Sequence, residues 1–204
     1  MSTPLIIGID FDNTIVSYNE VCYELALEQG LIPKELAHTK NAVRDYLRQQ
    51  GKEQRWTEFQ GHLYGPGIVK ALPFPGVLQF ITECKRRKIK VYVISHKTKY
   101  PFLGPKHDLH DYAHRWLEKQ GFSSNSDDQQ TIFLELTQEE KINRIKNLGC
   151  SHFIDDLPEI FEHRLFPGDV GKILFNPQTK ASVVSQNIIV SHHWNEIKNY
   201  FFPS

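Results

Sequence analysis

Two aspartates separated by one residue, Asp10 and Asp12, follow the apolar run 5–9 near the start of the sequence. Aspartate, asparagine and threonine are common in turns, so this pair alone favours a strand end followed by a polar turn. Two carboxylates held close together repel each other unless a cation or a shared proton offsets the repulsion. The pair therefore indicates a metal site only if a third carboxylate lies beside it.

A second acidic pair, Asp155 and Asp156, also follows an apolar run, at 152–154. In a parallel sheet both pairs lie at the edge formed by the carboxyl ends of the strands. Mg²⁺ prefers oxygen ligands and keeps several waters, so two or three carboxylates and a substrate phosphate suffice to bind it. The alternative is that Asp155 or Asp156 caps the helix expected to begin near Pro158.

Two further candidates, Ser95 and Lys141, lie near the ends of expected strands and helices. Ser95 closes the run 90–94 at the same edge, where its hydroxyl could hold phosphoryl oxygens or could simply form a turn. Lys141 lies in the first turn of a helix expected at 137–148, where a cation opposes the helix dipole. A bound phosphate would compensate for this, and solvent exposure of the lysine is the competing explanation.

Hydrophobic patterning predicts an α/β fold in which strands alternate with helices around a Rossmann-like parallel sheet. Its strands are short and nearly continuous in apolar character, as in strands covered on both faces. The expected strands are 5–9, 90–94, 131–134, 152–154, 172–175 and 187–190. The expected flanking helices are 76–87, 109–120, 137–148, 158–166 and 193–201. The helix at 137–148 begins with Thr137 and Glu140 at the spacing of a capping box.

The segment 17–72 breaks this alternation, because it shows helical periodicity and no convincing strand. An insert directly after the first strand is expected to cover the carboxyl edge of the sheet, where open α/β folds bind ligands. We expect it to form a small helical cap. The predicted domains are therefore a core made of 1–16 and 73–204, and a cap made of 17–72.

Composition places the chain among soluble globular proteins. It has 204 residues, 40% of them hydrophobic, and a formal net charge of +0, so nothing points to nucleic acid or an anionic membrane as a partner. The 3 cysteines form no metal motif or disulfide framework and are expected to be reduced and packed. Neither a secretory signal nor a run of about 20 apolar residues is present, which favours a cytoplasmic protein.

The order of these motifs resembles the haloacid dehalogenase-like (HAD) superfamily. Its members carry an Asp-x-Asp-x-Thr after the first strand, a strand-terminal Ser or Thr, a Lys, and a strand followed by paired acids. Here these motifs read Asp10-Phe11-Asp12-Asn13-Thr14, then Ser95, Lys141 and Asp155-Asp156. The resemblance covers the whole chain, with the insert 17–72 in the place of the family's helical cap.

The resemblance implies roles for these residues. Asp10 would attack the phosphoryl group and form an aspartyl-phosphate, while Asp12 acts as general acid and then general base. Mg²⁺ would be held by Asp10, by the backbone carbonyl of Asp12 and by Asp155, with Asp156 acting directly or through a water. The residues expected to contact the phosphate are Asn13, Thr14, Ser95, His96 and Lys141. The presence of Asp12 argues for phosphoryl chemistry over cleavage of a carbon–halogen bond.

The expected function is hydrolysis of a small phosphorylated metabolite. Two alternatives stay open: a HAD-fold binding or regulatory protein without turnover, and a phosphomutase. The long loop Lys97–His107 could bind a second anionic group of the substrate through Lys97, Lys99 and Lys106, or it could be a solvated loop. His107, His110 and His114 could share a helix face, but their spacing is weak evidence for zinc.

Overall fold

The computed structural model describes residues 4–122, 131–178 and 187–203. The chain divides into two compact units. The first unit is drawn from Met1–Val16, Pro73–His96 and Ser123–Ser204, and the second from Ser17–Leu72 and Lys97–Phe122. Each unit is described by itself.

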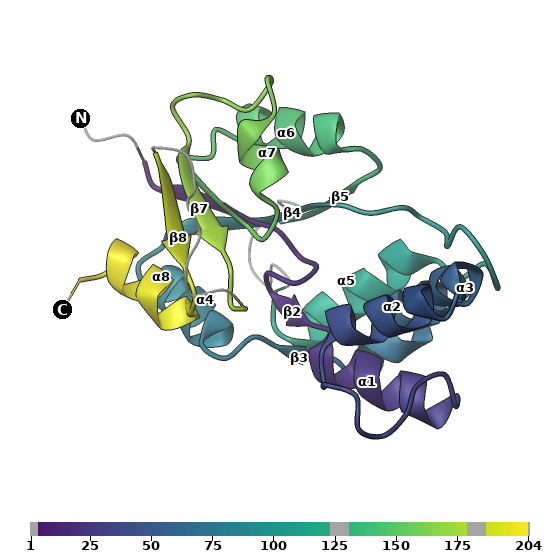
Figure 1. Ribbon diagram of the computed structural model, residues 1–204. Coiled ribbons are helices and arrows are strands. Elements are labelled where there is room, and N and C mark those ends of the chain that lie inside the picture. The colour runs from purple at the N-terminus through teal and green to yellow at the C-terminus, as the bar shows by residue number, and fades with distance from the viewer. Residues whose placement is uncertain (1–3, 123–130, 179–186, 204) are drawn as a thin grey trace. The chain divides into compact units, whose positions relative to one another are not determined.

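A parallel sheet of six strands forms the centre of the first unit (Figure 1). Its strands are β1 (Ile6–Ile9), β4 (Lys90–His96), β5 (Ile132–Glu135), β6 (His152–Asp155), β7 (Gly171–Phe175) and β8 (Ile188–Ser191). The spatial order is β5-β4-β1-β6-β7-β8, and every pair is parallel. Because β1 lies between β4 and β6, the residues at the carboxyl ends of these three strands lie close together at one edge of the sheet.

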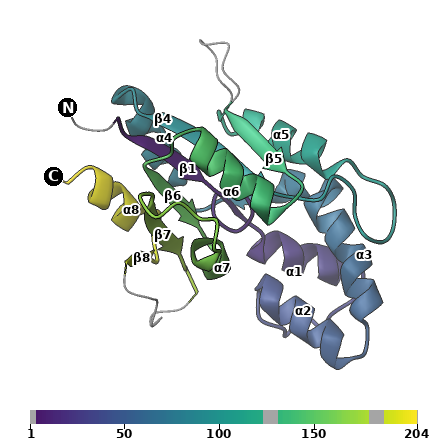
Figure 2. The ribbon, with the colours of Figure 1, turned by 90° about the horizontal axis from the view of Figure 1, so that it is seen from above.

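Helices cover both faces of this sheet. In Figures 1 and 2, α6 (Gln138–Asn147) and α7 (Pro158–Glu162) lie on one face, and α4 (Val77–Arg86) and α8 (Trp194–Phe201) lie on the other. The expected capping box begins α6: the Thr137 hydroxyl accepts from the Glu140 N–H, and the Glu140 carboxylate accepts from the Thr137 N–H. Such caps satisfy backbone donors that the first helical turn leaves unpaired.

The core of the first unit has two layers. The layer under α6 and α7 joins apolar side chains of the helices and strands, including Ile142, Ile145, Phe153, Ile160 and Phe161. Gly8 of β1 belongs to this layer, since a Cβ at that position would lie 2.6 Å from the Phe153 ring. The opposite layer is aromatic: the Trp194 ring lies 5.3 Å from that of Phe80 and 5.6 Å from that of Phe175, between centroids.

The second unit is helical. It contains α1 (Asn19–Glu28), α2 (Lys40–Gln49), α3 (Glu53–Tyr64), the 3-10 helix η1 (Pro66–Lys70) and α5 (Leu109–Lys119). The indole N–H of Trp116 in α5 donates to the Ala71 carbonyl at 3.0 Å. In α3, an added Cβ at Gly61 would lie 2.7 Å from the Pro101 side chain, so a glycine lets the loop after β4 approach this helix. Two further strands, β2 (Val16–Ser17) and β3 (Leu72–Pro73), form a separate pair.

The predicted α/β fold with a parallel sheet is confirmed, and each of the six expected strands is present. The helix expected at 158–166 is shorter, because the backbone of His163 is extended and ends α7 at Glu162. The second unit contains Lys97–Phe122 as well as the insert 17–72, and the division into a core domain and a cap domain stays a prediction. In the parts of the chain that are described, none of the helices has the length and hydrophobicity that a membrane span requires.

Candidate active site

The carboxyl ends of β1 and β6 bring the two acidic motifs together. Ile9 pairs with Ile154 in the register of these strands, and the backbone N–H of Asp10 donates to the Ile154 carbonyl at 2.9 Å. This bond fixes the backbone of Asp10 beside Asp155, the last residue of β6. Asp10 and Asp155 are both buried. The expectation that the strand ends would deliver the two motifs to one edge therefore agrees with the geometry.

Lys141 connects the two buried carboxylates. Its ammonium nitrogen lies 2.6 Å from Oδ1 of Asp10 and 2.6 Å from Oδ2 of Asp155. The side chain is 0% exposed, which excludes solvent exposure as the reason for a lysine in the first turn of α6. The unfavourable position relative to the helix dipole is thus offset by two carboxylates of the site.

Ser95 also binds Asp10. Its hydroxyl donates to Oδ1 of Asp10 at 2.8 Å, and both side chains are buried. Asp155 does not cap α7, because the N-cap residue is Leu157. Instead, Oδ1 of Asp155 accepts from the Leu157 N–H at 3.0 Å, which fixes the rotation of the carboxylate.

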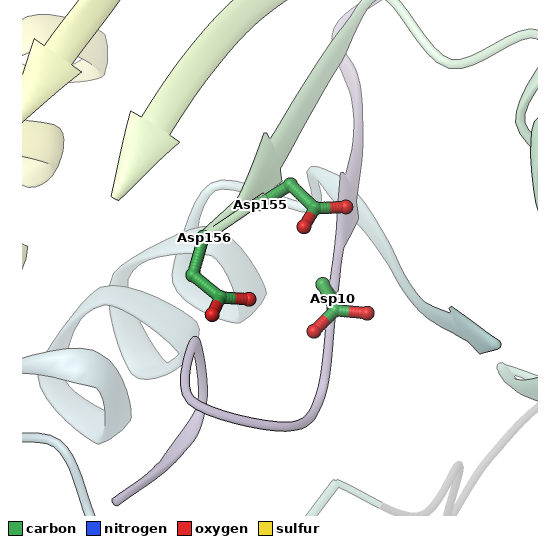
Figure 3. Close-up of side chains that lie close together, drawn as sticks. All are labelled: Asp10, Asp155 and Asp156. Atoms are coloured by element: carbon green, nitrogen blue, oxygen red, sulfur yellow. The ribbon is translucent and has the colours of Figure 1, made fainter. Parts of the chain in front are cut away.

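Asp156 completes a group of three carboxylates. One oxygen from each of Asp10, Asp155 and Asp156 lies within 4.8 Å of the others, and Figure 3 shows the three side chains at the ends of their strands. The Thr14 hydroxyl donates to Oδ1 of Asp156 at 3.4 Å. Among the described residues this is the one group of His, Cys, Asp and Glu side chains with the spacing of a metal site. Oxygen ligands of this kind suit Mg²⁺.

Burial and neighbouring charges set the protonation states of Lys141 and Asp155. Burial lowers the pKa of Lys141, but the adjacent Asp10 and Asp155 carboxylates outweigh it and hold the pKa above its ordinary value. Burial raises the pKa of Asp155; Lys141 opposes this effect and Asp10 adds to it. Lys141 is therefore an ammonium, and the site binds a cation more readily once Asp155 is deprotonated.

The structure resembles those of known proteins, although sequence comparison finds nothing: no protein-family model matches, and no curated protein matches. A protein from Clostridium acetobutylicum described as a predicted phosphatase is 14% identical, with a TM-score of 0.60 and 100% of both chains covered. The fold is the one found in solved structures of HAD-superfamily hydrolases.

Two further solved structures have the same fold. The phosphoserine phosphohydrolase-like protein of Francisella tularensis is 11% identical, with a TM-score of 0.56 over 97% of this chain and 100% of the other. A HAD family hydrolase of Deinococcus radiodurans, with bound phosphate and sodium, is 12% identical, with a TM-score of 0.52 over 98% and 96%. The HAD-like fold predicted from the sequence is confirmed.

A tight loop in this HAD-like fold carries Asp12, Asn13 and Thr14. The N–H groups of Ile15 and Val16 both donate to the Phe11 carbonyl, at 3.0 and 3.1 Å. Asn13 has a φ of 60°, in the left-handed region that asparagine tolerates better than most residues. Asp12 and Asn13 are half-buried, and their roles stay predictions.

One residue that holds this loop was not expected from the sequence. The indole N–H of Trp194 donates to the Thr14 carbonyl at 3.1 Å, and Trp194 is fully buried. Trp194 begins α8, 180 residues further along the chain than Thr14. No local pattern in the sequence indicates this contact, because it depends on how α8 packs on the sheet.

The other candidates are more dispersed. His96 is the last residue of β4 and is half-buried, so it lies at the same sheet edge as Ser95. Of the three histidines considered for zinc, His110 forms a 2.7 Å hydrogen bond with the Lys97 carbonyl, and the His107 ring contacts that of Tyr112. His107, His110 and His114 do not form a metal-binding group within the described ranges.

The cysteines are buried and free, as expected. Burial raises the pKa of Cys22, Cys84 and Cys150 to about 12, so these thiols stay protonated near neutral pH. They pack as small apolar side chains and take no part in the candidate site.

Proposed function

We propose that this protein is a Mg²⁺-dependent phosphomonoester hydrolase whose nucleophile is Asp10. The observation that carries the proposal is the convergence of Asp10, Lys141 and Asp155 at the carboxyl edge of the sheet. The names of similar structures, a predicted phosphatase and a phosphohydrolase-like protein, support the same reaction class. A carboxylate held beside a cation is suited to covalent phosphoryl transfer.

Asp10 is oriented for attack by its own contacts. Ser95 and Lys141 both bind Oδ1, so we assign Oδ2 as the atom that attacks phosphorus. A bond forms between Oδ2 and phosphorus while the bond from phosphorus to the ester oxygen breaks. Asp12 gives its proton to the leaving oxygen, then takes a proton from the water that attacks the aspartyl-phosphate. The second step releases phosphate and restores both carboxyl groups.

The remaining residues would hold the transferred phosphoryl group. The Lys141 ammonium supplies positive charge, and the Ser95 hydroxyl supplies a hydrogen-bond donor. Asn13, Thr14 and His96 lie in the loop after β1 or at the end of β4, from which they would contact the remaining phosphoryl oxygens. Trp194 would keep that loop in place through its bond to Thr14.

The donor set fits Mg²⁺. Three carboxylate oxygens lie close together, and two of the three residues are buried, so their mutual repulsion favours a cation. Asp10, Asp155 and Asp156 would be ligands, together with the Asp12 carbonyl. Bound Mg²⁺ would screen the negative charge of the nucleophile from that of the substrate. The similar HAD-hydrolase YfnB of Bacillus subtilis was solved bound to magnesium.

The substrate would be a small phosphorylated metabolite. The net charge of +0 argues against a polyanionic partner such as nucleic acid. We propose a cytoplasmic enzyme that has neither a nucleic-acid nor a membrane partner.

The test is phosphate release from a panel of phosphomonoesters, with Mg²⁺ and with EDTA, by wild type and by Asp10→Asn. We expect release that needs Mg²⁺ and is lost in the variant. Asp169→Asn is the matched control, because Asp169 is an exposed carboxylate of the first unit. Release that persists in EDTA or in Asp10→Asn contradicts the mechanism. Retained Mg²⁺ binding without release from any ester would favour a binding protein.

A further inference from the structure

A surface cavity of about 150 Å³ lies within the second unit, between the end of α1 and one face of α3. Four of the residues that line it follow one another along α3 at spacings of three, one and three, which places them on one side of the helix. The remaining two come from the end of α1 and the turn after it. The lining residues are Gln29, Leu31, Arg55, Glu58, Phe59 and His62.

A left-handed glycine ends α1 and brings the chain to the cavity. Gly30 has a φ of 65°, and its N–H donates to the Leu27 carbonyl at 2.9 Å. The Leu31 N–H donates to the Ala26 carbonyl, also at 2.9 Å. Helices commonly end in this way, and here the turn makes Leu31 part of the cavity wall. Together with the buried ring of Phe59, Leu31 gives the cavity an apolar portion.

Arg55 and Glu58 give the cavity one charge of each sign. Nη1 of Arg55 lies 3.3 Å from Oε2 of Glu58, and the two side chains are 67% and 35% exposed. An exposed ion pair of this kind contributes little to stability, so a ligand can take over its contacts at small cost. The two charges cancel, and the cavity therefore presents a dipole more than a net charge.

The carboxyl end of α1 adds partial negative charge beside Gln29, the C-cap residue. The last turn of α1, residues 25–28, has no basic residue to offset it. Lys70 is the nearby cation of η1, but its ammonium lies 2.9 Å from the Glu28 carboxylate and offsets that charge instead. The helix end and Glu58 thus favour a cationic group, while Arg55 favours an anionic one.

His62 and Gln29 add uncharged polar groups. Burial lowers the pKa of His62 below 6.5, so at neutral pH its ring offers one hydrogen-bond donor and one acceptor. Across residues 4–122, 131–178 and 187–203, no hydrogen bond or ion pair holds the His62 ring or the Gln29 amide. Polar groups of this kind beside an apolar wall are typical of sites for small organic ligands.

We propose that this cavity binds an α-amino acid with a small apolar side chain. Such a ligand carries an ammonium and a carboxylate on one carbon, so its charges can lie antiparallel to the Arg55–Glu58 pair. The carboxylate binds Arg55, and the ammonium binds Glu58 beside the end of α1. A ligand with a single charge would instead face the like charge of one member of the pair. The inference does not depend on the proposed phosphatase function.

The volume of the cavity limits the side chain. A cavity of about 150 Å³ accepts a molecule of roughly the size of benzene. The isopropyl group and Cα of valine fit this space against Leu31 and Phe59, while the charged groups lie at the exposed Arg55 and Glu58 side chains. Glycine would leave the apolar portion unfilled and should bind more weakly than valine.

L-Valine and two analogues of it test the proposal. 3-Methylbutanoate lacks the ammonium, 2-methylpropylamine lacks the carboxylate, and both keep the isopropyl group. The wild-type chain is titrated with each compound by calorimetry, and L-valine should bind about tenfold more tightly than either analogue. The same titration followed by NMR should shift the ring resonances of His62, which are assigned with His62→Gln.

Two variants remove one charge each. Arg55→Gln should reduce the preference for L-valine over 2-methylpropylamine to about onefold, because these ligands differ by the carboxylate. Glu58→Gln should do the same for the preference over 3-methylbutanoate. Arg115→Gln is the matched control, since it breaks the exposed ion pair of Arg115 with Asp111 in the same unit, outside the cavity, and should keep both preferences. Thermal unfolding checks that each variant is folded.

Several results would overturn the site. One is the lack of saturable L-valine binding at about 10 mM ligand. Another is an analogue that binds as tightly as L-valine, which would show that one of the two charges is not recognised. Binding that leaves the His62 resonances unshifted, or preferences that both variants keep, would place the amino acid elsewhere. If a variant does not fold, the comparison of the three ligands on the wild-type chain still decides.

Discussion

The Lys141 ammonium lies 2.6 Å from Oδ1 of Asp10, although the two residues are 131 positions apart in the sequence. The same nitrogen lies 2.6 Å from Oδ2 of Asp155. One buried cation therefore offsets two buried carboxylates. The free energy of unfolding should depend on this Lys141 ammonium. Removing one member of a buried ion group leaves the others without compensation.

Lys141→Met should destabilise the metal-free protein by about 3–5 kcal/mol, because methionine keeps the length of the side chain but not its charge. Added Mg²⁺ should recover part of this loss by supplying another cation. Denaturant unfolding with EDTA and with Mg²⁺ measures both effects. Lys146→Met, at an exposed lysine of the same helix, should stay within about 0.5 kcal/mol of wild type. Equal stability of the two variants would show that Lys141 has no structural role in the site.

Mg²⁺ should raise the melting temperature of the wild-type protein. A ligand that binds only the folded state at about 100 times its Kd adds about 2.7 kcal/mol to the free energy of unfolding. Asp155→Asn should lose most of this stabilisation, because it removes one of three converging carboxylates. Differential scanning calorimetry over a Mg²⁺ titration provides the measurement, with Asp169→Asn as control. An unchanged Mg²⁺ response in Asp155→Asn would remove Asp155 from the ligand set.

Trp194→Phe should lower kcat by about tenfold, since the loop that bears Asp12 and Thr14 would lose its indole donor. Loss of that hydrogen bond should cost about 1 kcal/mol of stability. Ile173→Val, a buried change in β7, should cost a similar amount of stability and leave kcat unchanged. Steady-state kinetics and thermal unfolding of the two variants separate positioning from stability. Equal kcat values would assign Trp194 to packing alone.

His152 should make the protein sensitive to acid. Burial lowers the pKa of His152 below 6.5, so the folded state favours the neutral ring. As the pH falls below 6.5, the unfolded chain takes up a proton before the folded one does. The contribution of His152 to stability is therefore present above that pH and is lost as the pH falls through the lowered pKa.

Unfolding free energies at about pH 7.5 and 5.5 test this effect. The difference between the two values should be smaller in His152→Gln than in wild type. His38→Gln is the control, because His38 is exposed. An undiminished pH dependence in His152→Gln would mean that other groups are responsible.

The sequence predicted the sheet and the first contacts of the site because both depend on simple rules. Apolar runs that alternate with helices specify a parallel sheet, and parallel strands place Asp10 and Asp155 at one edge. The position of Lys141 in a first helical turn was a physical anomaly that the two carboxylates explain. These are consequences of periodicity and of electrostatics within short segments.

Other features depend on packing between distant segments and were not predicted. The indole of Trp194 reaches the Thr14 carbonyl only because α8 packs on the sheet. Within the second unit, the indole of Trp116 bonds to the Ala71 carbonyl 45 residues earlier in the chain, a contact that strand and helix patterns do not reveal. The shared contact of Lys40 and Lys97 with Tyr64 likewise joins three separate segments.

The central claim is that Asp10 becomes phosphorylated during turnover. Hydroxylamine converts an aspartyl-phosphate into a hydroxamate with release of phosphate, and mass spectrometry of the digested protein locates the modified residue. With Mg²⁺ and p-nitrophenyl phosphate, whose leaving group departs without a proton, we expect the hydroxamate at Asp10 in wild type and more of it in Asp12→Asn, where the general base for the second step is missing. Hydroxamate at a different residue, or hydrolysis that continues in Asp10→Asn, would contradict the mechanism.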